Sequence, residues 1–278
     1  MQCKCSEIIN YMEQYAPSRL SQSWDNTGLL IGDPQQQINK VLVALDATPE
    51  VIGEAIEKGV ELIITHHPLI FKPISNIKKD NPLGDYIISL IKNNISLYSA
   101  HTNLDMAVGG VNDTLATVLQ LEDIHVLQSQ LSEKLNIFNI ENSKEEYGFA
   151  KIGKLNESKN LASFAEVVKK LLGITRVKIV GDVNKIINSV VVTSGAYSSI
   201  AKVAKDRGAD AIVTGDLKYH DAREIEDYGL CAIDAGHFAT ENIIVQVIID
   251  YITNIITEQN INIKIFKSQK SKDVFKIF

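Results

Sequence analysis

The chain has 278 residues, of which 45% are hydrophobic and 22% charged, and its formal net charge is −6. Such a composition is typical of a globular protein with a substantial core, in one large domain or two of ordinary size. The negative charge argues against a nucleic-acid partner, since phosphate binding favours a basic surface. No apolar run reaches the roughly 18 residues of a membrane span, and the N-terminus lacks the apolar core of a signal peptide. Three cysteines do not make a disulfide framework, which indicates a reducing, cytoplasmic location.

Short β-branched runs alternate with helical patterns along the first half of the chain. Apolar strands that are continuous, and are joined by helices, predict a parallel sheet covered on both faces. The expected elements, in chain order, are a strand at 41–45, a helix at 49–58 between the start signals Thr48 and Pro49 and the stop signal Gly59, a strand at 60–65, a helix at 83–92 and a strand at 95–99.

The second half of the chain repeats the pattern of the first. Val41–His67 matches Val190–Asp216 without a gap, and the hydrophobic, small and glycine positions coincide. Both halves then reach a His-x-x-x-acid segment, which two unrelated βαβ units would not be expected to share. We therefore predict an internal duplication and an α/β fold of two similar lobes.

The two copies differ where the second strand ends, because the first copy has His66 and His67 there and the second has Gly215 and Asp216. One specialised copy predicts a single site between the lobes. The alternation breaks in the middle of the chain, around the polar stretch 139–146. The expected division is a first lobe at 1–127, a connecting subdomain at 128–182 and a second lobe at 183–278.

The adjacent histidines His66 and His67 are the most informative feature of the sequence. Neighbouring side chains of a regular strand point to opposite faces, but the chain turns after a strand, and Pro68 favours extended geometry at His67. Ligands of open α/β sheets bind outside the carboxyl ends of the strands. Both rings can therefore reach one site, and a metal site is the favoured interpretation.

Two further segments carry the His-x-x-x-acid spacing. His237 and Glu241 lie in the segment that we expect to open one long helix through Ile256, and on a helix this spacing places both side chains on one face. His101 and Asp105 follow the strand at 95–99. Glu241 could instead be an acidic residue at a helix N-terminus, and Asp105 a turn former.

Five candidate ligands emerge from these segments, namely His66, His67, Asp105, His237 and Glu241. A single catalytic zinc typically takes three protein ligands and one water, so five ligands with two carboxylates suit two metal ions better. Zinc, iron, manganese, cobalt and nickel all accept this mixture of nitrogen and oxygen donors. We predict two divalent metal ions per subunit, of open identity.

Five segments of the sequence form a distinctive combination, namely Trp24–Gly32, Ile63–Phe71, His101–Asp105, Thr214–His220 and Asp234–Glu241. Together they resemble the dinuclear-metal-centre hexameric protein family, whose members are commonly labelled GTP cyclohydrolase 1 type 2 homologues or relatives of a yeast coactivator-interacting factor. The resemblance covers nearly the whole chain. It implies two intertwined three-layer α/β/α lobes, a toroidal homohexamer with metal sites facing an inner cavity, and the same five ligands.

His101 and His220 are the remaining polar candidates. Either could act as a general acid or base, or could hydrogen-bond in a structural role. Trp24 is expected to serve packing, and Asp25 to form a turn near the site. Asp46, at a strand end, could approach the metals.

Two classes of function remain open on the sequence. The first is a metal-dependent hydrolase of a nucleotide-like small molecule. The family label implies opening of the guanine imidazole ring of GTP with release of formate, but the chain has no Walker-type phosphate loop, so other phosphoester or nucleotide substrates fit equally. The second is a non-catalytic hexameric metal-binding scaffold or regulator.

Overall fold

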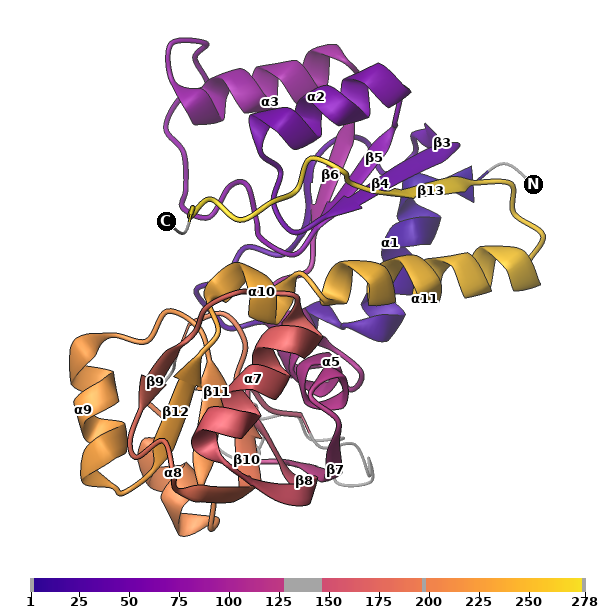
Figure 1. Cartoon of the computed structure of the whole chain (residues 1–278). Helices are drawn as coiled ribbons and strands as arrows, with labels where there is room; N and C mark the ends of the chain where they lie inside the picture. Colours follow the sequence, from indigo (N-terminus) through magenta and orange to yellow (C-terminus); the bar gives the residue numbers. More distant parts are fainter. Residues whose placement is uncertain (1–2, 128–146, 197–198, 277–278) are drawn as a thin grey trace. The chain divides into compact units, whose positions relative to one another are not determined.

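The computed structural model describes residues 3–127, 147–196 and 199–276, and the chain divides into two compact units. Unit 1 comprises 1–104 and 244–278, and unit 2 comprises 105–243. Each unit is built around its own sheet (Figure 1). The mixed α/β class expected from the sequence is confirmed. In the described ranges, no helix combines the length and apolar character needed to cross a membrane.

The sheet of unit 1 has five strands in the order β13-β4-β5-β6-β2. The first four are parallel, and β2 pairs antiparallel with β6. Two further short strands of the unit, β1 and β3, pair antiparallel with each other in a separate two-stranded sheet. The elements of the unit are β1 (Cys3–Lys4), α1 (Cys5–Tyr15), the 3₁₀ turn Ser18–Leu20, β2 (Gly28–Ile31), β3 (Gln37–Ile38), β4 (Lys40–Ala44), α2 (Pro49–Lys58), β5 (Leu62–Thr65), α3 (Pro82–Lys92), β6 (Ser96–Ser99), the start of α4 (Thr102–Met106), α11 (Ile244–Glu258) and β13 (Lys264–Lys267).

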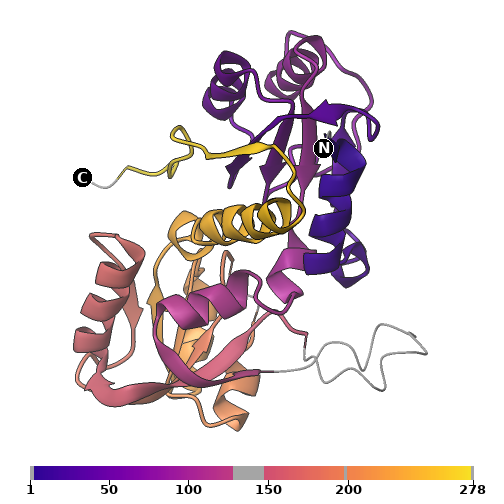
Figure 2. The same ribbon diagram turned by 90° about the vertical axis from the view of Figure 1, so that its right-hand side faces the viewer.

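Helices cover both faces of this sheet. Leu42 and Ile63 share a buried cluster with Val51 of α2 and Leu90 of α3. The alternate strand residues point the other way, where α11 packs on β4 and β13 (Figure 2). α1 lies alongside α11, and the rings of Tyr15 and Tyr251 stack 4.5 Å apart.

The local signals that predicted α2 are present in the structure. The Thr48 hydroxyl accepts a hydrogen bond from the backbone N–H of Val51, Pro49 occupies the first turn, and Gly59 ends the helix in the left-handed conformation with φ 61°. The Thr48 hydroxyl pairs with a backbone N–H that has no partner within the helix, and Gly59 adopts the left-handed conformation that often ends a helix. The predicted bounds of this helix, 49–58, are confirmed.

The sheet of unit 2 has six strands in the order β7-β8-β10-β11-β12-β9. The three strands β10, β11 and β12 are parallel, and the outer strands pair antiparallel with their neighbours. The elements of the unit are the end of α4, α5 (Val111–Val118), β7 (Leu121–Val126), β8 (Lys151–Asn160), α7 (Leu161–Leu172), β9 (Lys178–Val180), β10 (Ile186–Val192), α8 (Ala201–Asp206), β11 (Ala211–Thr214), α9 (Tyr219–Asp227), β12 (Cys231–Asp234) and α10 (His237–Glu241).

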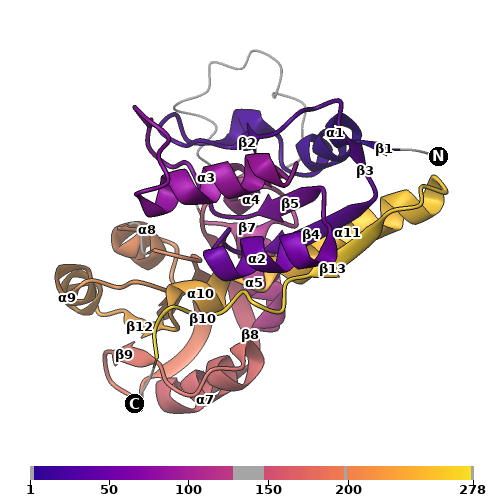
Figure 3. The same ribbon diagram turned by 90° about the horizontal axis from the view of Figure 1, so that it is seen from above.

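Unit 2 is likewise a three-layer structure. Val190 and Val192 of β10 belong to a cluster with side chains of α5 and α7, while Val191 belongs to a second cluster with side chains of α8 and α9. Figure 3 shows α7 and the pair α8 and α9 on opposite faces of this sheet. Because successive strand residues alternate between faces, both faces of β10 are buried.

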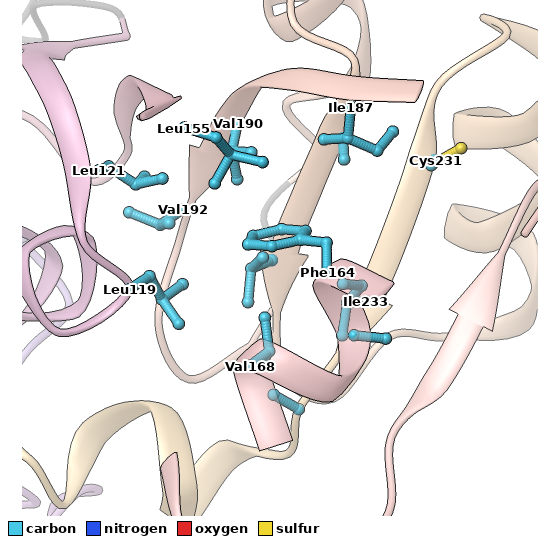
Figure 4. Close-up of a cluster of buried hydrophobic side chains, with 14 of the residues drawn as sticks. Leu119, Leu121, Leu155, Phe164, Val168, Ile187, Val190, Val192, Cys231 and Ile233 are labelled. Carbon is cyan, nitrogen blue, oxygen red and sulfur yellow. The ribbon is translucent and has the colours of Figure 1, made fainter. Parts of the chain in front are cut away.

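Phe164 of α7 lies at the centre of the first of these clusters, with Ile187, Val190 and Ile233 around its ring (Figure 4). Its side chain is fully buried. We expect Phe164→Ala to lower the free energy of unfolding by about 3–5 kcal/mol, because it removes apolar contacts and leaves a cavity. Urea unfolding measures the loss. Phe275→Ala is the matched control, since Phe275 is 74% exposed, and an equal loss in both variants would contradict the prediction.

The arrangement of the two units agrees with an internal duplication. β4-α2-β5-α3-β6 and β10-α8-β11-α9-β12 run in the same order through three parallel strands. Val41 pairs with Leu62 in the first sheet. The residues that the gap-free match places against them, Val190 and Ala211, pair with each other in the second.

A polar detail repeats as well. The carboxylate of Glu61 accepts hydrogen bonds from the backbone N–H groups of Asn39 and Lys40 at the start of β4. At the matching position of unit 2, the carboxylate of Asp210 accepts from the N–H groups of Asn188 and Ser189. An acidic residue before the second strand thus anchors the first strand in both units.

The structure differs from the sequence-based division. β8 and β9 are strands of the six-stranded sheet, and α7 packs on that sheet, so the described part of the expected connecting subdomain is part of unit 2. The polar stretch 139–146 lies outside the described residues. α11 and β13 belong to unit 1, because the apolar face of α11 packs on β4 and β13. The prediction of a single helix through Ile256 is wrong, since α10 ends at Glu241 and α11 begins at Ile244.

Candidate metal centre

The histidine doublet follows directly on β5 in unit 1. The backbone N–H of His67 donates to the carbonyl of Leu45, and the Thr65 hydroxyl donates to the carbonyl of His67 at 2.8 Å. The Thr65 hydroxyl also lies 2.8 Å from that of Ser99 on β6. These contacts hold the backbone of the doublet at the carboxyl end of the sheet, as the sequence predicts.

Three imidazole rings gather there, from His66, His67 and His101. Ring nitrogens of the three residues lie within 4.8 Å of one another. Each Nδ1 lies within hydrogen-bonding distance of an oxygen acceptor, an arrangement typical of histidines that bind a metal ion through Nε2. The acceptors are the Ala100 carbonyl for His66 at 2.8 Å, Asp46 Oδ1 for His67 at 2.7 Å and Asp25 Oδ1 for His101 at 2.8 Å.

Asp25 is the most firmly held of these acceptors. Its side chain is fully buried, one oxygen accepts from His101, and the other accepts from the backbone N–H and the hydroxyl of Thr102. Burial acts to raise the pKa of Asp25, but the hydrogen bonds from His101 and Thr102 outweigh it and lower the pKa to about 2. Asp25 is therefore an anion that orients His101, and not only the turn former that the sequence suggests.

Asp25→Asn is expected to lower the affinity for a divalent cation by about 10–100-fold, because the substitution removes the charge that orients His101. Dialysis against a metal buffer, followed by elemental analysis, measures the affinity. Asp33→Asn is the control, since the Asp33 carboxylate accepts a hydrogen bond in an exposed turn. Unchanged metal affinity in a folded Asp25→Asn protein would contradict this role.

A second set of donors lies in unit 2, on and beside α10. His237 Nε2 lies 3.0 Å from Glu241 Oε2, and His237 Nδ1 lies 2.8 Å from Asp216 Oδ2. Asp105 and Glu241 offer carboxylate oxygens within 4.8 Å of each other. Two carboxylates at this separation repel one another, and a bound cation offsets that repulsion.

Two glycines make room for these donors. A Cβ atom on Gly195 would lie 2.1 Å from Glu241 Oε1. A Cβ atom on Gly215 would lie 2.3 Å from the carbonyl oxygen of Gly195 and 2.7 Å from the backbone nitrogen of His237. Gly215 occupies the position that matches His66 in unit 1. A histidine cannot stand there without moving the backbone, which explains why only one copy carries the doublet.

Asp234, at the end of β12, connects the two loops that carry Asp216 and His237. Its buried carboxylate accepts hydrogen bonds from the backbone N–H groups of Leu217 and Gly236, and from Lys178 Nζ. The residue therefore fixes the loops that set the distance between Asp216 and His237.

The structure thus brings the predicted ligands of each unit together within that unit. It also adds three residues that the sequence analysis did not commit to the site, Asp25, Asp216 and Asp234. Asp216 could have been found from the repeat, because it matches His67. His220, predicted as a catalytic residue, is exposed in the first turn of α9 next to Tyr219. Among the described residues, the clusters able to hold a metal do not include it.

Comparison with known proteins gives the family. The model of the Duf34/NIF3 (NGG1p interacting factor 3) family matches residues 3–274. The chain belongs to this family. A relative from Clostridium perfringens, named GTP cyclohydrolase 1 type 2 homolog, is 40% identical to this chain over 238 residues. The match covers 86% of this chain and 87% of the relative. A relative of the same name from Clostridium acetobutylicum is 36% identical and covers 99% of both chains.

Solved structures show the same Duf34/NIF3 fold. A Bacillus cereus protein related to NIF3 superposes with a TM-score of 0.92 at 29% identity, over 100% of this chain and 99% of the other. A Staphylococcus aureus protein superposes with a TM-score of 0.89 at 31% identity, over 99% of both chains. The family expected from the motifs is therefore confirmed.

Proposed function

We propose that this Duf34/NIF3 protein is a dinuclear metal-dependent hydrolase that acts on a nucleotide-like small molecule. Five residues, His66, His67, Asp105, His237 and Glu241, would hold two divalent ions, and His101 would be a sixth donor. The observation that carries the proposal is that four histidines, three in unit 1 and one in unit 2, have Nδ1 engaged by an oxygen acceptor. This arrangement is typical of metal-ligating histidines.

The donor set fits such a centre in its chemistry. Neutral imidazoles with two carboxylates suit zinc, iron, manganese, cobalt and nickel alike. His101 and Asp105 are four residues apart at α4, a spacing that puts two side chains on the same face of a helix. Six donors for two ions leave coordination positions for substrate and water.

When bound, the ions would supply Lewis-acid polarisation of the substrate and would activate water at neutral pH. The chain's own residues orient the reaction. Asp25, Asp46 and Asp216 each hold a histidine ring through Nδ1. Glu241 is 4% exposed, so its carboxylate acts where bulk water is excluded and electrostatic effects are strong. His220, in the first turn of α9, is proposed to carry a proton.

The names of the relatives support a nucleotide as the substrate. Both clostridial proteins carry the name GTP cyclohydrolase 1 type 2 homolog. On this basis we propose hydrolytic opening of the guanine imidazole ring of GTP with release of formate, and other nucleotide hydrolysis as the alternative. A homohexamer and a cytoplasmic location also remain predictions.

Metal removal tests the proposal. The untreated protein is analysed for metal, stripped with a chelator, and reloaded separately with zinc, manganese, iron, cobalt or nickel ions. Each form is incubated with GTP and a panel of nucleotides, and formate, phosphate and the ring-opened product are measured. We expect about two ions per subunit and a product that appears only in a reloaded form. Formate release from GTP identifies the cyclohydrolase, and phosphate release identifies the alternative.

Turnover of no substrate in any metal form, with the ions bound, would overturn the hydrolase proposal and favour a metal-binding scaffold. Anomalous scattering at the absorption edges of these metals, from crystals of untreated protein, would identify the ions. Finding Asp105 or Glu241 away from the ions would overturn the ligand set.

A further inference from the structure

Two large aromatic side chains of unit 1 lie exposed beside the three-histidine cluster. Trp24 is 58% exposed and Phe71 is 46% exposed. Their ring centroids are 5.8 Å apart, and each lies close to the His101 ring, at 6.3 Å for Trp24 and 6.2 Å for Phe71. The sequence assigns Trp24 a packing role, yet more than half of its surface is open.

The loop that carries Trp24 is held by its polar neighbours. Ser21 and Thr27 join its ends through their hydroxyl groups, 2.8 Å apart. The next residue after Trp24, Asp25, makes the buried hydrogen bonds to His101 and Thr102. Trp24 is thus an exposed aromatic residue on a loop held by hydrogen bonds, and an apolar side chain of restricted mobility loses little entropy when it binds a ligand.

A direct hydrogen bond also links this loop to the backbone next to Phe71. Asn26 Nδ2 donates to the carbonyl of Ile70, the residue before Phe71. The segments that carry the two aromatic rings are therefore linked to each other. The planes of the two rings meet at 63°, so a planar ring stacked on one would meet the other edge-on. Aromatic rings favour both of these arrangements.

We propose that Trp24 and Phe71 form a stacking subsite for a planar heteroaromatic ring of the substrate, next to the three-histidine cluster. The proposal deepens the proposed function and rests on it for the identity of the ligand as a nucleotide-like molecule. It commits the exposed pair to a purine-like base instead of a contact with another protein. The closeness of both rings to His101, which belongs to the candidate metal centre, supports this choice.

The composition of the chain allows a direct test, because Trp24 is the only tryptophan in the sequence. Intrinsic tryptophan fluorescence therefore reports on this ring alone. Guanosine, adenosine and ribose 5-phosphate are titrated separately into metal-free and metal-loaded protein. We expect saturable quenching by the two nucleosides and none by ribose 5-phosphate, which has no aromatic ring.

Variants measure the contribution of each ring. Binding of guanosine by calorimetry is expected to weaken about 5–150-fold in Trp24→Ala, which is the range for loss of one base–aromatic stack, and to be largely kept in Trp24→Phe. Phe71→Ala is expected to weaken binding less, because an edge contact buries less area. Phe275→Ala is the matched control, since Phe275 is a 74% exposed aromatic residue outside the candidate site.

The outcomes separate this subsite from the proposed function. Nucleoside binding that depends on Trp24, with no hydrolysis in any metal form, would support the subsite and overturn the hydrolase. Hydrolysis with the same KM in Trp24→Ala as in the unchanged protein would overturn the subsite and leave the hydrolase. Trp24 emission that changes with protein concentration and not with nucleoside would show a contact between copies of the chain, and would also overturn the subsite.

Discussion

Glu241→Gln is expected to lose at least one of the two proposed metal ions and to lower the proposed hydrolysis more than about 100-fold. Loss of a residue that merely orients a ligand costs about 10–100-fold, so loss of a ligand carboxylate should cost more. Glu241 has the largest expected effect because its carboxylate lies close to both His237 and Asp105. Glutamine has nearly the same shape, so the fold should persist. Elemental analysis and the hydrolysis assay measure the two effects.

Glu258→Gln is the control for this experiment, because it makes the same chemical change at an exposed residue, at the end of α11. It should keep both metal content and activity. Full metal occupancy in folded Glu241→Gln protein would remove Glu241 from the ligand set. Full occupancy with lost activity would instead assign it to the reaction alone.

Gly195→Ala is expected to weaken metal binding by about 10–100-fold, although the substitution adds only a methyl group. The new Cβ would lie 2.1 Å from Glu241 Oε1, so the carboxylate must move away from its present place. A displacement near 1 Å at a catalytic group can lower activity on the order of 100-fold. Metal affinity and hydrolysis are both measured, as for Glu241→Gln.

The backbone itself contributes to this effect, since Gly195 has φ +64°. A left-handed alanine costs roughly 1–2 kcal/mol of stability. Gly208→Ala isolates that cost, because Gly208 has φ +75° and an added Cβ would meet nothing within 4 Å. Both variants should lose similar stability in urea, and only Gly195→Ala should lose metal affinity. Equal metal affinity in the two would contradict the prediction.

Local signals made much of the fold predictable. The bounds of α2 follow from Thr48, Pro49 and Gly59, which act on their own helix ends. The repeat was visible because two βαβ units keep the same hydrophobic pattern. The membership of α11 and β13 in unit 1 was not predictable, because more than 200 residues separate them from β4 along the chain. Only packing decides such a partnership.

The ligand types were likewise readable, whereas their orientation was not. His66, His67, His237 and Glu241 stand out by spacing and by their place after strands. Asp25 lies 76 residues before His101, and no local pattern relates the two. The exposure of Trp24 was also not predicted, because a large aromatic side chain is on average well buried, whereas this one is 58% exposed.

The sequence by itself therefore determined the family and the α/β class, and it predicted the repeat and the candidate donor residues, because each depends on residue types at short spacing. Only the tertiary structure decided which acceptor holds each histidine, why Gly215 replaces a histidine in the second copy, and which aromatic rings stay open beside His101. These depend on distances between segments far apart in the chain, and folding alone brings such segments together.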